Sequence, residues 1–165
     1  MTISRILVPT DFSPDADAAF AYALDLATSV GAAVDLLHVV EDPMAAGVWS
    51  APMYNAELAG LHINLVRDAK ERLRRCVPMI AGIRFGVFRD VRIGPAASTI
   101  IDTARERACD LIVMGTRGRT ALSQMLMGSI AERVVRLAPC PVLTVKTKEA
   151  YLRANSLPRD ARASA

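Results

Sequence analysis

Three glycines and a serine in the second half of the chain stand at a spacing that suits phosphate binding. An apolar run of four residues ends at Gly115, Gly118 follows it, and Gly128 stands directly before Ser129. Ser129 opens a helical pattern, so the stretch predicts a strand, a glycine-containing loop and the start of a helix. In such an arrangement the N–H groups of the loop and of the helix N-terminus hold an anion together. The sequence therefore predicts a phosphate-binding loop between Gly115 and Ser129.

Each of these four residues also has a purely structural explanation. Gly115 can end a strand, Gly118 can form a turn, and Ser129 can cap a helix. Their spacing matches neither the dinucleotide motif G-x-G-x-x-G nor the phosphate-loop motif G-x-x-x-x-G-K-[ST]. Their joint position between a strand end and a helix start favours phosphate binding over the structural explanation.

The elements that position this loop alternate between strands and helices. Strands are predicted over 4–9, 33–40, 85–93, 110–115 and 141–146, and helices after Ser13, from about 55 to between 78 and 82, over 98–108 and from 129. Most of the strands are continuous apolar runs, as expected for parallel strands buried on both faces, whereas the alternation in 85–93 predicts an edge strand. The fold class is therefore α/β, an open and mostly parallel sheet that binds ligands at the carboxyl ends of its strands.

Local signals predict where two of the helices begin and end. Ser13 precedes a proline and two acidic residues, a pattern typical of a helix N-terminus, and Gly31 is placed to end that helix. The segment from Ser129 to Glu132 matches a capping box, so we expect Ser129 to cap the last helix. The predicted apolar stripe of that helix consists of Ile130, Val134 and Leu137.

Composition and charge argue against several classes of protein. The 165 residues suffice for one domain, and no apolar run approaches the roughly 20 residues that span a bilayer. The N-terminus lacks the features of a secretory signal, so we expect a cytoplasmic protein without membrane contact. The net charge is +3, but the tail from Thr147 holds four basic and two acidic residues, which leaves the body nearly neutral. A nearly neutral body predicts that the protein does not bind nucleic acid.

The few cysteines and histidines argue against a metal site or a catalytic site. Cys76, Cys109 and Cys140 are widely spaced and are expected to be buried thiols, without a disulfide or a zinc site. His38 lies inside a predicted strand between apolar neighbours, so we expect a hydrogen-bonded core histidine rather than a catalytic base. No nucleophile motif, metal-ligand cluster or carboxylate pair accompanies it. The sequence therefore predicts no catalytic residue and no metal ligand.

The sequence resembles universal stress proteins of the UspA family, and among them the ATP-binding branch, over residues 4–146. The shared segments are ILVPTDFSPDA, LLHVVED, the Gly94-Pro95 pair, DLIVMGTRG and APCPVLTVK. The family signature G-x2-G-x9-G-[ST] matches Gly115, Gly118, Gly128 and Ser129. The resemblance implies a flavodoxin-like or Rossmann-like sheet in the order 3-2-1-4-5, with helices on both faces. Residues 1–146 are then the universal stress protein domain, and the basic tail 147–165, which has few apolar anchors, is expected to be mobile.

The resemblance also implies a cofactor and the residues that bind it. The cofactor is ATP, with Mg²⁺ accompanying the phosphates. The adenine is expected near Pro9, Thr10, Asp11 and the backbone of Val39, and the ribose near Met114 and Gly115. The phosphates are expected at the backbone N–H groups of Gly118, Gly128, Ser129 and Ile130, together with the Ser129 hydroxyl. The resemblance further implies a homodimer joined through the last strand, 141–146.

Some residues near this site keep two explanations. Arg117, at a loop position that varies in the family, is either a cation near the phosphates or a solvated loop charge. Asp11 either contacts the nucleotide or serves the start of the first helix. The side chains of Trp49, Met53 and Tyr54 either fold over the adenine as a lid or cover the sheet edge or a dimer surface.

The function that the resemblance implies is a dimeric, nucleotide-responsive module in stress signalling, with at most slow ATP hydrolysis or autophosphorylation. Two alternatives stay open. One is an adenine-nucleotide hydrolase or transferase on the same kind of sheet, which needs a catalytic group that the sequence does not display. The other is an interaction module of the same fold that binds no nucleotide, in which the glycines only shape the turn.

Overall fold

The structure is a computed structural model that describes residues 2–41, 56–76, 86–118 and 127–147. Along the chain the elements are β1 (Arg5–Pro9), α1 (Pro14–Val30), β2 (Ala33–Val40), α2 (Ala56–Cys76), β3 (Val87–Ile93), α3 (Ala96–Glu106), β4 (Leu111–Gly115), α4 (Ser129–Leu137) and β5 (Val142–Val145). The strand pairs are parallel, and the sheet order is β3-β2-β1-β4-β5. The predicted fold class, the sheet order and the edge position of β3 are therefore confirmed.

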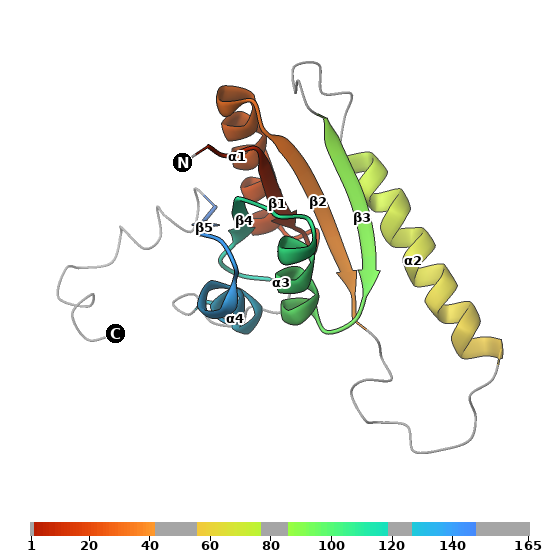
Figure 1. Ribbon diagram of the computed structural model, residues 1–165. Coiled ribbons are helices and arrows are strands. Elements are labelled where there is room, and N and C mark those ends of the chain that lie inside the picture. Colours follow the sequence, from red (N-terminus) through yellow and green to blue (C-terminus); the bar gives the residue numbers. More distant parts are fainter. Residues whose placement is uncertain (1, 42–55, 77–85, 119–126, 148–165) are drawn as a thin grey trace, which may run out of the picture.

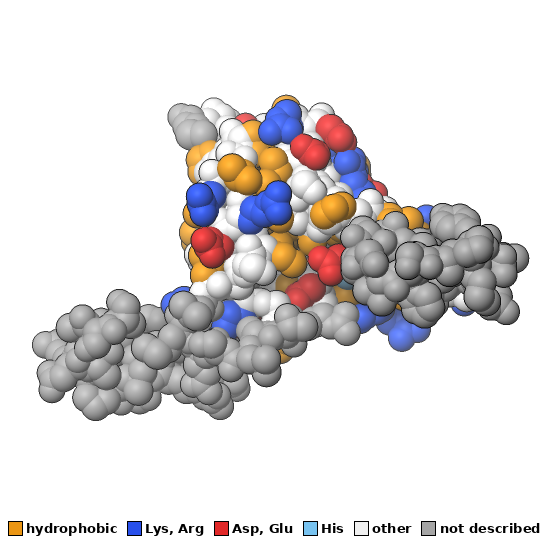
Figure 2. All heavy atoms as spheres, turned by 90° about the horizontal axis from the view of Figure 1, so that it is seen from below, with side chains coloured by type: hydrophobic (Ala, Val, Ile, Leu, Met, Phe, Trp, Pro, Cys, Tyr) orange, Lys and Arg blue, Asp and Glu red, His pale blue; other side chains and the backbone are white. Residues whose placement is uncertain are grey.

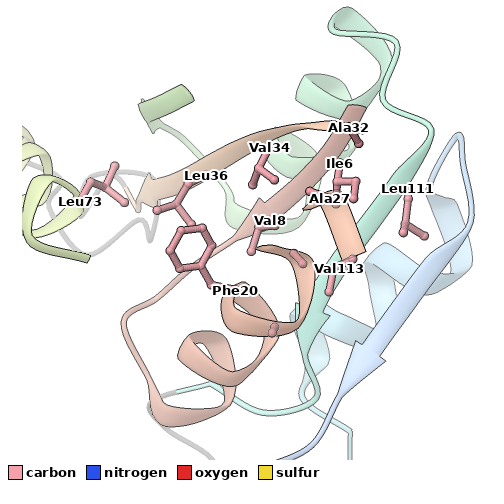
Figure 3. Packing of buried hydrophobic residues seen from close by; sticks show 12 residues of the cluster. Ile6, Val8, Phe20, Ala27, Ala32, Val34, Leu36, Leu73, Leu111 and Val113 are labelled. Carbon is pink, nitrogen blue, oxygen red and sulfur yellow. The ribbon is translucent and has the colours of Figure 1, made fainter. Parts of the chain in front are cut away.

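The helices cover both faces of the sheet (Figure 1). α1 and α2 pack on one face, and α3 and α4 pack on the other. The core under α1 and α2 is aliphatic apart from one phenylalanine, and Figure 3 shows its members Ile6, Val8, Phe20, Val34, Leu36 and Leu73 pointing toward one another. Within the described ranges, no helix has the length and hydropathy needed to cross a membrane.

The opposite side of the same strands forms a second core. Successive side chains of a strand point to opposite faces, so Leu7 of β1 and Leu37 of β2 lie on the side of α3 and α4. Ile100 of α3 and Val134 of α4 belong to the same cluster, with Ile112 of β4. Burial on both faces explains why these strands are continuous apolar runs in the sequence.

α1 begins and ends where the sequence signals predict. The Ser13 hydroxyl accepts the N–H of Ala16 at 3.3 Å, so Ser13 is the N-cap. Gly31 ends the helix at φ 74°, a left-handed conformation that glycine adopts without strain. Because α1 begins shortly after β1 ends, its first turn lies at the carboxyl end of the sheet.

Two predictions about α4 are wrong. Gly128 is the N-cap, with φ −63° and ψ 145°, and no side chain caps the helix, so Ser129 is the first helical residue rather than the cap. Of the predicted apolar stripe only Val134 is buried, whereas Ile130 is 40% and Leu137 56% exposed. α4 packs mainly beside α3, and its buried residues are Ala131 and Val134.

α3 is also displaced from its predicted range of 98–108. Pro95 takes the N-cap position, so the helix begins at Ala96, two residues early. It ends at Glu106 because Ala108 adopts the left-handed region at φ 48°, and the Cys109 N–H then donates back to the Ala104 carbonyl. Residues with a Cβ atom rarely adopt this conformation, so an alanine in the sequence does not predict the end of a helix.

The cysteine prediction is only partly confirmed. The three thiols are free, and Cys109 is buried, but Cys76 and Cys140 are only partly buried. Burial raises the pKa of Cys109 to about 12, so this thiol stays protonated at neutral pH. Several predictions lie outside the described residues, namely Trp49, Met53 and Tyr54, the end of the second helix beyond Cys76, and the tail after Thr147.

Candidate functional site

A cleft of about 310 Å³ opens at the carboxyl ends of β1 and β4. These strands pair with each other, and the sheet continues from β1 to β2 on one side and from β4 to β5 on the other. Open α/β sheets bind ligands at such a reversal of strand order. The volume lies at the lower end of the range for small-molecule sites. Figure 2 shows this end of the molecule, where hydrophobic and charged side chains lie side by side.

The cleft brings together the eleven residues predicted to bind a nucleotide. They are Pro9, Thr10, Asp11, Val39, Met114, Gly115, Arg117, Gly118, Gly128, Ser129 and Ile130. They come from the ends of three strands, the segments that follow β1 and β4, and the start of α4. Their proximity is a property of the fold, and their role in binding a nucleotide stays a prediction.

Six further residues line the cleft that sequence reasoning missed: Ala16, Leu37, Ala96, Ile100, Thr116 and Ala131. Leu37 stands two residues before Val39 on β2, so both side chains point to the same face, and strand alternation was a usable signal. Ala96 and Ile100 lie at the start of α3, directly after the Gly94-Pro95 pair. Most of the six are apolar, so the cleft has an apolar wall that suits an uncharged ring.

The segment after β1 is held by hydrogen bonds of its own side chains. The Phe12 N–H donates to the Thr10 hydroxyl at 3.0 Å, and the Ser13 N–H donates to Asp11 Oδ1 at 3.1 Å. Phe12 has φ 62°, which is uncommon for a residue with a Cβ atom. Asp11 thus serves the start of α1, as one of its two explanations predicts, and it also lines the cleft. A carboxylate can do both because it has two acceptor oxygens.

His38 of β2 supports the same segment. Its Nδ1 lies 2.7 Å from the Thr10 carbonyl oxygen, and its ring lies 4.5 Å from that of Phe12. The guanidinium of Arg72, from α2, lies 4.0 Å from the centroid of the Phe12 ring. The predicted hydrogen bond of His38 is confirmed, but the residue is only partly buried and is not part of the core.

Three glycines of the cleft differ in what an added Cβ atom would meet. At Gly118 it would lie 3.0 Å from Asp11 Oδ2, so the loop after β4 passes close to the carboxylate after β1. At Gly115 it would lie 2.8 Å from the backbone carbon of Asp15, so the packing of β4 against α1 requires a glycine there. At Gly128 it would make only ordinary contacts, the nearest at 3.5 Å. Packing does not require Gly128, and its missing side chain leaves room in the cleft.

The N-terminus of α4 offers hydrogen-bond donors to the cleft. The first N–H groups of a helix have no partner within the helix, and Ser129 and Ile130 are the first two residues of α4. In the described part of the chain, neither of these amides nor that of Gly118 donates a hydrogen bond. The Gly128 N–H, in contrast, donates to the Thr116 carbonyl at 2.9 Å. The amides available to a phosphate are therefore those of Gly118, Ser129 and Ile130.

Arg117 has a partner that the sequence did not indicate. Its Nε donates to Asp15 Oδ2 at 3.2 Å, and its side chain is only 23% exposed. It is therefore not a solvated loop charge. Because Arg117 also lines the cleft, its predicted proximity to the phosphates stays open.

The chemistry that these residues offer is binding. Asp11 and Arg117 are the charged side chains among the described residues of the lining. Over the described ranges, no group of three or more His, Cys, Asp or Glu residues could hold a metal ion. Backbone amides, a helix N-terminus and one arginine favour an anion, and the apolar wall favours a ring. The cleft therefore fits a ligand that carries both an anionic group and an uncharged ring.

Comparisons with known proteins show the family of the chain and agree with its fold. The universal stress protein family model matches residues 2–146. Universal stress protein MJ0531 of Methanocaldococcus jannaschii is 33% identical over 144 residues, which are 86% of this chain and 81% of that protein. The structure of UspA from Lactobacillus plantarum has a TM-score of 0.77 at 29% identity and covers 88% of this chain and 99% of that one. A universal stress protein from Archaeoglobus fulgidus in complex with dAMP shares the fold, with a TM-score of 0.56 at 20% identity over 88% of this chain and 100% of that one. The chain therefore belongs to the universal stress protein family.

Proposed function

We propose that this protein binds ATP and acts as a dimeric module whose nucleotide occupancy alters an interaction with another protein. The observation that carries the proposal is the start of α4, where the amides of Gly118, Ser129 and Ile130 adjoin the room left by Gly128. A phosphate is a ligand that such a cluster of amides stabilises, because it accepts several hydrogen bonds and is favoured by the helix dipole. The relative in complex with dAMP carries an adenine nucleotide on the same fold.

The cleft also suggests how ATP lies in it. Leu37 of β2 pairs with Pro9, the last residue of β1, and β2 continues beyond this pair. Val39 therefore lies where β2 has no partner residue in β1. We place the adenine beside Val39, Thr10 and Asp11, which line the cleft from the ends of β2 and β1. Met114 and Gly115 of β4 then adjoin the ribose, and the phosphates extend to α4.

The proposal includes Mg²⁺ and at most slow hydrolysis. Mg²⁺ binds readily to phosphates with few protein ligands, so the nucleotide itself would carry it. Among the described residues that line the cleft, Asp11 is the one carboxylate, and its Oδ1 already accepts the Ser13 N–H. A fast hydrolase needs a base that orients water at the γ-phosphate. A cytoplasmic location, where ATP is abundant, completes the proposal.

Titration calorimetry with Mg-ATP tests the proposal. We expect saturable binding of one nucleotide per chain, because one cleft combines the amides with the apolar wall. A parallel turnover assay should find little phosphate release, and fast release would favour the hydrolase or transferase instead. If no binding is detected at millimolar nucleotide, the protein is an interaction module in which the glycines only shape the turn.

We propose further that two copies associate through β5. This strand is the outer edge of the sheet next to β4, and its four residues, Val142–Val145, are all only partly buried. An apolar edge strand pairs readily with a second chain. Native mass spectrometry of freshly purified protein should give twice the chain mass of 17.8 kDa, together with any bound nucleotide. A species of one chain mass at micromolar concentration would contradict the dimer.

A further inference from the structure

An ion pair connects the first turn of α1 to the loop after β4. Arg117 Nε lies 3.2 Å from Asp15 Oδ2, and the Thr116 hydroxyl donates to the same oxygen at 3.3 Å. The Asp15 side chain is only 9% exposed. The close approach depends on Gly115, where any side chain would collide with the backbone of Asp15. The pair is therefore built into the packing of β4 against α1 and is not a chance surface contact.

The pair uses only part of the arginine. A guanidinium carries five N–H donors in a rigid plane, and the Nε atom supplies one of them to Asp15. In the described ranges the two terminal nitrogens of Arg117 make no hydrogen bond or ion pair. Arg117 stands next to Gly118, and a Cβ atom at Gly128 would lie 3.8 Å from its Cα. Arg117 also lines the cleft, so its backbone lies beside the place where the amides gather.

Arg117 supplies the positive charge at this end of the cleft. Arg117 is the one cationic side chain among the described lining residues. An unrestrained arginine loses considerable rotamer freedom when it is fixed by a ligand, which weakens binding. Asp15 restrains it beforehand, and the N-terminus of α1 favours a carboxylate at this position even without the arginine. The main effect of the ion pair is therefore to fix the position of Arg117, since the helix N-terminus already stabilises the Asp15 carboxylate.

We propose that Asp15 is a positioning residue that holds Arg117 for the phosphate chain, so that the protein prefers nucleotides with several phosphates over the monophosphate. The inference rests on the proposed nucleotide binding. Asp15 then affects the nucleotide affinity only through Arg117, and this effect increases with the number of phosphates. Removal of Asp15 should therefore change the ratio of the affinities for ATP and AMP.

Calorimetry with ATP and with AMP tests this on the wild type, Asp15→Asn, Arg117→Gln and the double variant. Asp15→Asn should weaken ATP binding by about 2- to 10-fold and AMP binding much less, since the amide keeps an acceptor for Arg117 but loses the charge that holds the guanidinium. In the Arg117→Gln background it should have no further effect. Asp17→Asn is the matched control, because Asp17 is exposed in the same turn of α1 and should leave the ATP to AMP ratio unchanged.

Several outcomes would overturn the proposal. They are an equal loss of ATP and AMP affinity, a gain in ATP affinity, an effect that persists without Arg117, and the same effect in Asp17→Asn. If Asp15→Asn does not fold, Arg117→Lys replaces it. The lysine keeps the charge but lacks the guanidinium that can hold Asp15 and a phosphate at once, so the ATP preference should fall, though less than in Arg117→Gln. An unchanged preference in Arg117→Lys would overturn the proposal as well. Failure of the wild type to bind either nucleotide would instead contradict the proposed function itself.

Discussion

Replacing Gly128 with aspartate is expected to abolish ATP binding and leave the fold intact. The backbone at Gly128, with φ −63° and ψ 145°, suits any L-residue, and an added Cβ atom would meet nothing closer than 3.5 Å. The carboxylate would project beside the Thr116–Gly118 loop, where the phosphates are proposed to lie. Like charges at such distances cost several kcal/mol, so the affinity should fall by about 100-fold or more.

The Gly128→Asp variant should be slightly more stable than the wild type. Gly128 is the N-cap of α4, and aspartate is a better N-cap than glycine by a few tenths of a kcal/mol. Calorimetry and thermal denaturation of the same sample separate the two effects. Gly128→Ser is the matched control, since it also improves the cap but adds no charge, and its loss of affinity should be smaller. Unchanged ATP affinity in Gly128→Asp would contradict the placement of the phosphates at α4.

Replacing Gly115 with alanine is expected to destabilise the whole domain. The added Cβ atom would lie 2.8 Å from the backbone carbon and 3.0 Å from the carbonyl oxygen of Asp15. Backbone atoms of a helix cannot move aside as a flexible side chain does, so α1 must shift away from β4. Overpacking of this kind costs about 1–3 kcal/mol, which is roughly 2–12 °C in melting temperature for a chain of this size.

Urea denaturation measures this loss directly. Gly128→Ala provides the control, because it adds the same methyl group where there is space. Alanine is a poorer N-cap than glycine, but it also lowers the entropy of the unfolded chain, so the unfolding free energy should change by less than about 0.5 kcal/mol. Gly115→Ala should therefore lose stability, and Gly128→Ala should not. Equal stability of the Gly115→Ala variant and the wild type would contradict the close packing of β4 on α1.

The sequence predicts the fold well where local chemistry decides the outcome. Ser13 and Gly31 each act through their own backbone and side chain, so the ends of α1 are where they were expected. The prediction fails where contacts between distant residues decide between two locally favourable structures. Ser129 would make a capping box in isolation, but the Gly128 N–H donates to Thr116 across the loop. Gly128 is the N-cap, so the helix begins at Ser129, one residue earlier than the capping box predicts.

The candidate site shows the same division. The eleven predicted residues line one cleft because the family signature and the strand ends fix their positions. The Asp15–Arg117 pair could not be predicted, since it joins residues about a hundred positions apart and depends on the approach that Gly115 permits. Which amides of the loop stay available also depends on the cross-loop bond of Gly128, and no spacing of glycines reveals it.

The proposed function depends on the amides of Gly118, Ser129 and Ile130, which are expected to bind the phosphates of a nucleotide. Titration of isotope-labelled protein with Mg-ATP, followed by amide NMR, observes these three groups themselves. Their resonances should shift strongly with ATP and much less with adenosine, which has no phosphate. Saturation by ATP with these three resonances unmoved, or no response at millimolar ATP, would contradict the proposal.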